Sequence, residues 1–307
     1  MYVYGPVPSR RLGRSLGVSP IPRKRCSYSC VYCQLGKTRK PSIERESFFP
    51  KEDILKEILS KCSIDLPDYV TFVGDGEPTL NKDLGWLISR TKEETGSRIA
   101  VITNGSLLYR DDVKSDLANA DVVLPSLDAG TARTFITVNR PHEDLNFDKI
   151  VQGIADFREM FTGAVWLEVM LVSGFNDTDD EIENIRKYVQ LIRPQRVYVL
   201  VPIRPPAERW VKPPNRERLL HAKLALTDVH IISDPESGSF DVSSFDNAKS
   251  AIIEIGGRHP LRVDEAVEIE SEFEEIGIVR KMIEAGELVE AKYDGIEYVL
   301  PQIPEIE

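Results

Sequence analysis

The chain lacks any run of about 18 consecutive apolar residues, the length that a transmembrane helix requires. No apolar signal segment stands at its start, where the sequence is Met-Tyr-Val-Tyr-Gly-Pro, so we expect a cytoplasmic protein. Hydrophobic residues make up 41% and charged residues 29% of the 307 positions, which is typical of a folded globular protein. This length allows one large domain or two smaller ones.

Cysteine is scarce, and three of the four cysteines fall in one short run. Cys26, Cys30 and Cys33 have the spacing C-x3-C-x2-C. This uneven distribution argues against a disulfide framework, which uses paired cysteines and belongs mostly to oxidising compartments. A structural zinc site takes four ligands, and the nearest histidine is the distant His142, so zinc would need a remote fourth ligand. The remaining Cys62 stands in a helical pattern and is interpreted as a small buried residue.

Three thiolates are one fewer than the set that usually holds an iron–sulfur cluster. A four-iron, four-sulfur cluster held by three cysteines leaves one iron open to bind another molecule. The spacing therefore favours a cluster with an open iron, while zinc binding and chance spacing remain alternatives.

Short apolar runs alternate with helical patterns from residue 12 to about residue 233. The apolar runs show no clean polar alternation, as in strands that are buried on both faces. Six strand-then-helix units predict a parallel sheet with right-handed crossovers, either doubly wound or a partial barrel. The predicted strands are residues 12–20, 69–73, 99–103, 122–127, 165–172 and 196–201. The predicted helices are residues 50–61, 82–94, 111–117, 147–160, 179–192 and 215–226.

Polar residues and glycines follow each predicted strand. In parallel-sheet proteins, the loops at the carboxyl ends of the strands meet on one rim and carry the active site. Taken singly, Glu77 with its following proline suits a helix start, and Ser126 or Asp128 suits a helix cap. Together with the cysteine run, however, these loops indicate one functional rim. Asn176 and Arg204 are candidates for substrate contact because they also stand at strand ends.

Over residues 12–206 the sequence resembles the radical SAM superfamily. The three cysteines match its C-x3-C-x2-C signature, and Tyr32 is the aromatic residue usual before the third cysteine. The resemblance implies a partial (β/α)6 barrel in which Cys26, Cys30 and Cys33 hold a 4Fe–4S cluster and S-adenosylmethionine (SAM) binds the open iron. The positions similar to the family's SAM contacts are Gly76 and Glu77 for the amino group, Thr103, Asn104, Ser126 and Asp128 for the ribose and carboxylate, and Gly174 for adenine.

The resemblance also implies a reaction. An electron from the reduced cluster cleaves SAM, and the resulting 5′-deoxyadenosyl radical takes a hydrogen atom from a substrate, while the protein binds and orients the reactants. An electron donor such as flavodoxin or ferredoxin is the implied partner. No motif indicates a catalytic residue that acts on the substrate itself.

The segment 5–17 resembles a group that neighbours the wyosine-synthesis enzymes, which modify a guanine of tRNA. Archaeal wyosine synthases carry additional N-terminal cysteines, and none precedes Cys26 here, so the match is to the neighbourhood of those enzymes. Residues 1–40 hold nine basic and no acidic residues, which suits a polyanion such as RNA, a nucleotide or a phosphorylated metabolite. The net charge of −11 for the whole chain opposes broad nonspecific binding of nucleic acid.

The C-terminal part has a different composition. We expect a barrel over residues 1–240, a linker over 241–256 and an acidic winged-helix-like domain over 257–307. Predicted helices at 259–267, 271–276 and 278–285 precede a hairpin of residues 288–292 and 296–300, with Asp294 and Gly295 in its turn. Residues 257–307 contain 14 acidic and five basic residues, which opposes DNA binding and favours a partner protein, a peptide substrate or a structural role.

Two classes of function follow. The first is a radical SAM enzyme whose substrate the sequence does not identify, with a tRNA base or nucleotide as one candidate and a glycyl-radical-enzyme activase or a peptide-modifying enzyme as alternatives. The second is a non-catalytic iron–sulfur or zinc protein that docks a partner through its acidic C-terminal domain.

Overall fold

The computed structural model describes residues 1–226, 229–233, 240–243 and 245–302. Within these ranges, eight strands form one curled sheet whose spatial order follows the sequence. Neighbouring strands from β2 to β8 pair in parallel, whereas β1 pairs antiparallel with β2 at one edge. The strands are β1 (Val3–Ser9), β2 (Gly13–Val18), β3 (Tyr69–Phe72), β4 (Ile99–Thr103), β5 (Val122–Pro125), β6 (Ala164–Met170), β7 (Arg196–Leu200) and β8 (Val229–Ile232).

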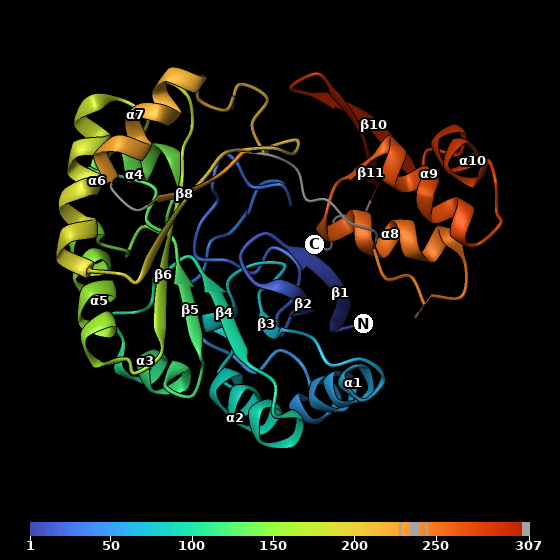
Figure 1. Cartoon of the computed structure of the whole chain (residues 1–307), viewed down its shortest axis with the longest axis horizontal. Helices are drawn as coiled ribbons and strands as arrows, with labels where there is room; N and C mark the ends of the chain where they lie inside the picture. The colour runs from blue at the N-terminus through green and yellow to red at the C-terminus, as the bar shows by residue number, and fades with distance from the viewer. Residues whose placement is uncertain (227–228, 234–239, 244, 303–307) are drawn as a thin grey trace.

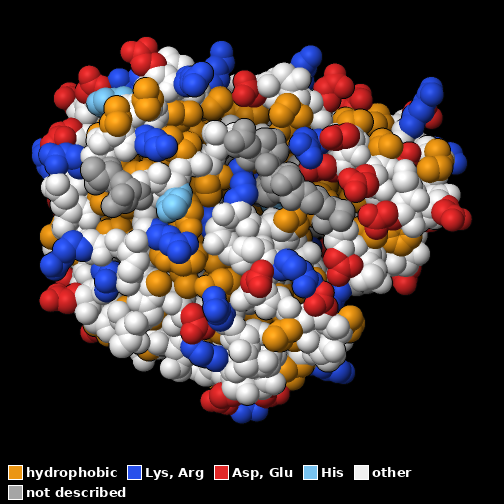
Figure 2. Space-filling model, in the orientation of Figure 1, with side chains coloured by type: hydrophobic (Ala, Val, Ile, Leu, Met, Phe, Trp, Pro, Cys, Tyr) orange, Lys and Arg blue, Asp and Glu red, His pale blue; other side chains and the backbone are white. Residues whose placement is uncertain are grey.

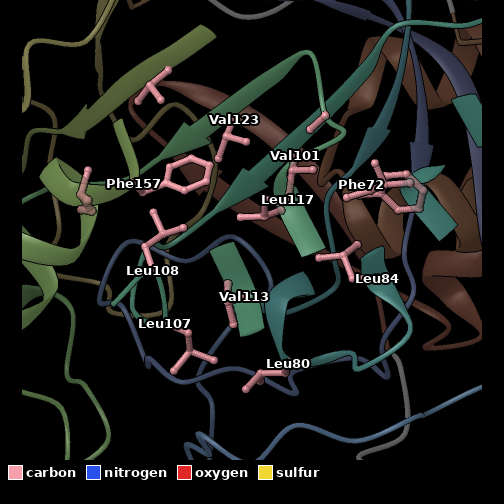
Figure 3. Packing of buried hydrophobic residues seen from close by; sticks show 14 of the residues in the cluster. Phe72, Leu80, Leu84, Val101, Leu107, Leu108, Val113, Leu117, Val123 and Phe157 are labelled. Carbon is pink, nitrogen blue, oxygen red and sulfur yellow. The ribbon is translucent and has the colours of Figure 1, made fainter. Parts of the chain in front are cut away.

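Helices cover the outer side of this sheet (Figure 1). They are α1 (Lys51–Ile64), α2 (Leu84–Thr95), α3 (Asp111–Leu117), α4 (Ala132–Val138), α5 (Phe147–Met160), α6 (Asp179–Ile192) and α7 (Arg216–Leu226). Figure 3 shows Phe72, Val101 and Val123 of β3, β4 and β5 facing Leu84 and Leu117 of α2 and α3, and all five are fully buried. Burial of these side chains between sheet and helices supplies most of the stability of the barrel.

The partial parallel barrel expected from the sequence is confirmed, and each of the six predicted strands and six predicted helices is present. The structure adds β1, α4 and β8. Strand β1 contains a glycine and two prolines, which are unfavourable inside a sheet but are tolerated on an edge strand. In the ranges described above, no helix is long and apolar enough to cross a membrane.

A smaller C-terminal unit follows the barrel. It contains α8 (Ala248–Arg258), β9 (Leu261–Arg262), α9 (Val263–Glu272), α10 (Ile278–Glu284), β10 (Leu288–Tyr293) and β11 (Ile296–Pro301). The three strands form a sheet in the order β10-β11-β9, and the unit has its own buried apolar cluster, which includes Ile252, Leu261 and Met282. Asp294 and Gly295 both have positive φ angles in the β10–β11 turn, as the predicted Asp-Gly hairpin requires.

The helices of this unit differ from their predicted ranges. Residues 248–258 fall mostly in the predicted linker, yet they form α8, whose N-cap is Asn247. The helix predicted at 259–267 begins only at Val263, because Leu261 and Arg262 pair with β11. The helix predicted at 271–276 is the end of α9 and a turn, in which Glu274 and Gly277 have positive φ. The predicted loop at 233–239 lies almost entirely outside the described residues.

Candidate cofactor site and substrate cavity

The loop that carries the three cysteines follows β2 and is held by a segment more than 100 residues away. The Ser29 backbone N–H donates to the Asn139 carbonyl (3.0 Å), and the Val31 N–H donates to the Val138 carbonyl (2.9 Å). The His142 N–H donates to the Ser27 carbonyl at 2.9 Å. The end of α4 and the loop after it therefore form a backbone clamp on the cysteine loop, and His142 takes part through its main chain.

The three cysteine side chains are partly buried, and the thiols of Cys26 and Cys33 are near enough to Cys30 to affect its pKa. Burial raises the pKa of the Cys26 thiol to about 12. The pKa of Cys30 is raised well above its usual value, first by burial, then by the negative charge of Asp128 and by the other two cysteines. Such thiols stay protonated without a metal, so binding of iron, which takes thiolates, releases protons.

Each cysteine sulfur also faces a side-chain nitrogen. In the described residues no three His, Cys, Asp or Glu side chains are arranged to hold a single metal ion. Three neighbouring thiols with N–H groups directed at their sulfurs are instead a donor set that fits an iron–sulfur cluster. The nitrogen–sulfur distances are 3.6 Å from Asn104 Nδ2 to Cys26, 3.6 Å from Asn139 Nδ2 to Cys30, and 3.3 Å from Lys24 Nζ to Cys33.

Gly76 lies where the loop after β3 meets the start of the cysteine loop. A Cβ atom at Gly76 would lie 2.0 Å from the Arg25 carbonyl oxygen, so only glycine fits this approach. The Glu77 N–H donates to the same carbonyl at 2.9 Å, and the Lys24 N–H donates to the Asp75 carbonyl at 2.6 Å. The residue type at position 76 thus follows from backbone packing against the loop of Cys26.

The carboxylate of Glu77 joins the loops after β3 and β4. It accepts hydrogen bonds from the Thr103 hydroxyl (2.6 Å), the Thr79 hydroxyl (2.6 Å), the Thr79 N–H (3.1 Å) and the Asn104 N–H (2.7 Å). Glu77 is 1% exposed, and burial raises its pKa. Its side chain therefore holds Thr103 and Asn104 in place, and contact of this loop with the SAM amino group stays a prediction.

Asp128 links the end of β5 to the cysteine loop. Its carboxylate accepts from the Tyr32 hydroxyl, from Asn139 Nδ2 (2.7 Å) and from the Met170 N–H (2.8 Å). Burial raises the pKa of Asp128. Ser126 lies beside it, and its N–H donates to the Thr103 carbonyl at 3.0 Å. The predicted carboxylate and ribose positions thus lie on one rim with the cysteines, whereas their roles stay predictions.

Asn176 and Gly174 shape the loop after β6. The fully buried Asn176 donates to the carbonyls of Asp128 (2.6 Å) and Met170 (2.7 Å), and it accepts from the Val172 N–H (2.6 Å). This set of partners makes Asn176 a structural bridge between the β5 and β6 ends. Gly174 has a φ of +76°, and a Cβ atom there would meet open space. The left-handed backbone conformation, and not crowding, therefore favours glycine at this position.

A cavity of about 310 Å³ occupies the inside of the barrel below this rim. Part of its lining, Leu12 and Ile232, belongs to an apolar cluster that also includes Val122 and Trp166. Glu168 points into the cavity two residues further along β6 than Trp166, because alternate strand residues face the inside. Glu168 forms an ion pair with Arg11, and burial raises its pKa. In the sequence this carboxylate stands inside an apolar run, where a charged residue indicates a polar site. The run as a whole predicted only a buried strand, so the site was not predicted.

The C-terminal unit completes the wall of this cavity through Arg258 and His259. Gln34 Nε2, one residue after Cys33, donates to the Arg258 carbonyl at 2.8 Å. Arg23, three residues before Cys26, donates to the Gly257 carbonyl. The last carbonyls of α8 lack hydrogen-bond partners inside the helix. They thus accept hydrogen bonds from residues on both sides of the three cysteines.

The comparison that decides the family is a match of residues 21–189 to the model of the radical SAM superfamily. The chain belongs to the radical SAM superfamily. It is 35% identical over 310 residues to a UPF0026 protein of Methanocaldococcus jannaschii, covering 98% of this chain and 96% of that protein. The resemblance noted in the sequence is thereby confirmed.

Two solved structures share the fold of this radical SAM chain. A radical SAM methyltransferase from Sphaerobacter thermophilus has a TM-score of 0.56 at 16% identity, over 72% of this chain and 67% of that one. The wyosine-synthesis enzyme TYW1, with a lysine-pyruvate adduct bound, has a TM-score of 0.52 at 16% identity, over 69% of this chain and 72% of that one. At this identity the likeness concerns the fold alone.

Superfamily membership makes the chain a radical SAM enzyme with a 4Fe–4S cluster and SAM as cofactors. The expected cofactors are thereby confirmed, and the non-catalytic alternative is wrong. The site also contains groups that sequence reasoning missed, namely Lys24, Asn139, Glu168 and Arg258. Asn139 and Arg258 were not predicted because their contacts with Cys30, Gln34 and Met1 join segments more than 100 residues apart.

Proposed function

We propose that this enzyme cleaves SAM reductively and abstracts a hydrogen atom from a nucleotide or a tRNA base held inside the barrel. When bound, the reduced cluster supplies the electron that cleaves SAM to methionine and the 5′-deoxyadenosyl radical. The observation that supports the substrate class is the described lining of the cavity, which includes the guanidinium groups of Arg10, Arg11, Arg204 and Arg258. Guanidinium groups suit the planar oxyanions of phosphate.

The roles of the rim residues follow from their positions around the cysteine loop. Cys26, Cys30 and Cys33 hold the cluster, and the loop of Gly76 and Glu77 receives the amino group of SAM. The ribose and carboxylate of SAM contact Thr103, Asn104, Ser126 and Asp128, and the adenine packs near Gly174. The hydrogen bonds that the carboxylates of Glu77 and Asp128 accept from neighbouring loops support these roles, because they hold the loops in a preorganised arrangement.

Radical SAM enzymes need a reductant, and we infer a small electron carrier such as flavodoxin or ferredoxin. The acidic side chains of the C-terminal unit gather on the face seen in Figure 2 and are available to a partner protein there. A glycyl-radical-enzyme activase and a peptide-modifying enzyme stay as alternatives. Each of them would act on a large substrate bound at the rim of the barrel.

The direct test is SAM cleavage. The protein is reconstituted anaerobically with iron and sulfide, reduced with dithionite and mixed with SAM, and 5′-deoxyadenosine is measured by mass spectrometry. We expect its formation with the native chain and its loss in Cys30→Ala. A fully loaded protein that forms no 5′-deoxyadenosine would contradict the proposal. Nucleoside analysis of bulk tRNA from a deletion strain tests the tRNA substrate, for which an unchanged profile is the negative result.

A further inference from the structure

We propose that Glu168 and Arg11 select the substrate by its base, and that they recognise an edge with two neighbouring N–H donors beside a carbonyl. Among the four RNA bases only guanine presents this edge. The inference rests on the proposed function for the view that the cavity holds a nucleotide or a tRNA base. Glu168 is a specificity-determining residue in it and takes no part in the transfer of the hydrogen atom.

Glu168 is a buried carboxylate with few hydrogen-bond donors around it. It is 4% exposed and lines the cavity from β6. In the part of the chain that the structure describes, its side chain accepts a hydrogen bond from Arg11 alone. The similarly buried carboxylates of Glu77 and Asp128 accept four and three hydrogen bonds from the loops around them. An ionised carboxylate can accept about four, so Glu168 keeps acceptor capacity for a ligand.

A buried carboxylate with this unused capacity is costly for a purely structural residue. Burial raises the pKa of Glu168, while the positive charge of Arg11 opposes that rise and favours the ionised form. An ion pair that served only to brace the turn between β1 and β2 would need no space beside it, yet both residues line a cavity of about 310 Å³. N–H groups of a ligand in this cavity would supply the donors that the carboxylate lacks.

Arg11 restricts the kind of ligand group that fits beside Glu168. An ammonium or guanidinium ligand would meet the like charge of Arg11, so neutral N–H donors are favoured. The ion pair with Glu168 engages Nη1 of Arg11, and a guanidinium has further N–H groups that can donate to a carbonyl of the ligand. A carboxylate beside a guanidinium therefore matches an edge on which two N–H groups stand next to a carbonyl.

Glu168 also lies close to the proposed position of SAM. Its carbonyl accepts from the Leu127 N–H at 2.8 Å, and Ser126 pairs with Glu168 in a parallel β-bridge. Further along β6, the Met170 N–H donates to Asp128 at 2.8 Å. Glu168 is therefore the neighbour, on β6, of the residues proposed to contact the SAM ribose. A base held by Glu168 inside the barrel would stand near this ribose, which carries the radical.

The experiment compares three ligands that differ only in the base. Reconstituted protein with SAM is titrated anaerobically by calorimetry with the 5′-monophosphates of guanosine, inosine and adenosine. Inosine lacks the amino group of guanosine, and adenosine lacks both the ring N–H and the carbonyl. We expect guanosine monophosphate to bind about tenfold more tightly than inosine monophosphate, because one hydrogen bond to a charged acceptor contributes this much. Adenosine monophosphate should bind more weakly than either.

Glu168→Gln tests the residue itself. The amide has the size of the carboxylate but offers one acceptor and one donor, a pair that suits adenine. The ratio of the guanosine to the adenosine monophosphate affinity should therefore fall by about tenfold or more. Misfolding would weaken all three ligands together, so it would not change this ratio. The matched control is Glu183→Gln, which removes the carboxylate of a half-exposed arginine pair on α6 and should leave the ratio unchanged.

The outcomes separate this inference from the proposed function. No saturable binding of any of the three ligands, or affinities that do not favour guanosine monophosphate, would overturn the base site, as would an unchanged ratio in Glu168→Gln. Binding requires no reductant and is measured apart from SAM cleavage. A protein that prefers guanosine monophosphate yet forms no 5′-deoxyadenosine would refute the proposed function and keep the base site. A protein that cleaves SAM without this preference would do the reverse.

Discussion

The Nε atom of Arg258 in α8 lies 3.3 Å from the Oδ2 atom of Asp75, in the loop that follows β3. Asp75 directly precedes Gly76, whose backbone packs against the residue before Cys26. The carbonyl of Arg258 accepts from Gln34, directly after Cys33. One residue of the C-terminal unit therefore contacts both the predicted SAM loop and the cysteine loop, so the position of the unit and the geometry of the site are linked.

Replacing Arg258 tests this link. Arg258→Gln removes the ion-pair partner of the half-buried Asp75, so we expect the free energy of unfolding to fall by about 1–3 kcal/mol and SAM to bind more weakly. Faster hydrogen exchange in α8 would show the loosened docking. The matched control is Arg280→Gln, which removes an exposed arginine of the same unit. Equal exchange in the two variants would contradict the link.

The cluster ligands are tested by iron content. Cys30→Ala leaves two thiols, and we expect reconstituted protein to lose the full cluster, because its irons then lack a ligand. Cys62→Ala is the control, since Cys62 lies in α1, half-buried against the apolar core and away from the cysteine loop. Iron and sulfide analysis with electron paramagnetic resonance measures both variants. A full cluster in Cys30→Ala would refute the ligand assignment.

Lys24 is expected to tune the cluster through its charge. Its ammonium lies 3.3 Å from the Cys33 sulfur and stabilises the more negative, reduced cluster. Lys24→Met should therefore lower the reduction potential by about 60–130 mV, the value of one charged hydrogen bond in a one-electron couple. A potentiometric titration followed by electron paramagnetic resonance checks this shift. Lys37→Met, which removes an exposed lysine of the same loop, should leave the potential where it is.

Glu77 is expected to stabilise the rim more than to react. In Glu77→Gln an amide NH₂ replaces a carboxylate oxygen that accepts from surrounding donors, so we expect a loss of about 1–3 kcal/mol of unfolding free energy. Urea unfolding measures the loss, and faster hydrogen exchange at Asn104 would locate it. Glu52→Gln, on the exposed side of α1, serves as the control. Unchanged stability in Glu77→Gln would refute the structural role of this carboxylate.

Acid is expected to weaken the helix packing near Asp112. The hydrogen bonds from Arg110 and then Arg45 hold the pKa of Asp112 well below its usual range. A carboxyl with a lowered pKa stabilises the fold above its unfolded-state pKa, and this contribution is lost as the pH falls through the folded-state pKa. Asp112→Asn should therefore lose less stability than the native chain between pH 7 and about pH 2. Urea unfolding at the two pH values measures the loss of unfolding free energy in each protein. Equal losses in Asp112→Asn and in the native chain would contradict this expectation.

Much of the barrel could be predicted because its signals are local. The apolar runs of β3 to β7 and the capping residue Thr178 of α6 lie within a few residues of the elements they specify. The prolines and glycine of β1 concealed an edge strand, whose pairing with β2 only the sheet reveals. In the same way, the strand pairing of Leu261 moved the start of α9 away from its predicted place.

The sequence by itself determined the family and its cofactors and predicted the cluster ligands, because Cys26, Cys30 and Cys33 lie in one short segment whose spacing is fixed along the chain. Only the tertiary structure decided what surrounds them. Asn139 and Arg258 reach the cysteine loop across more than 100 residues, through contacts that depend on how the chain is packed. Such long-range contacts leave no periodic signal in the sequence, which is why the cavity and its C-terminal wall emerged from the fold alone.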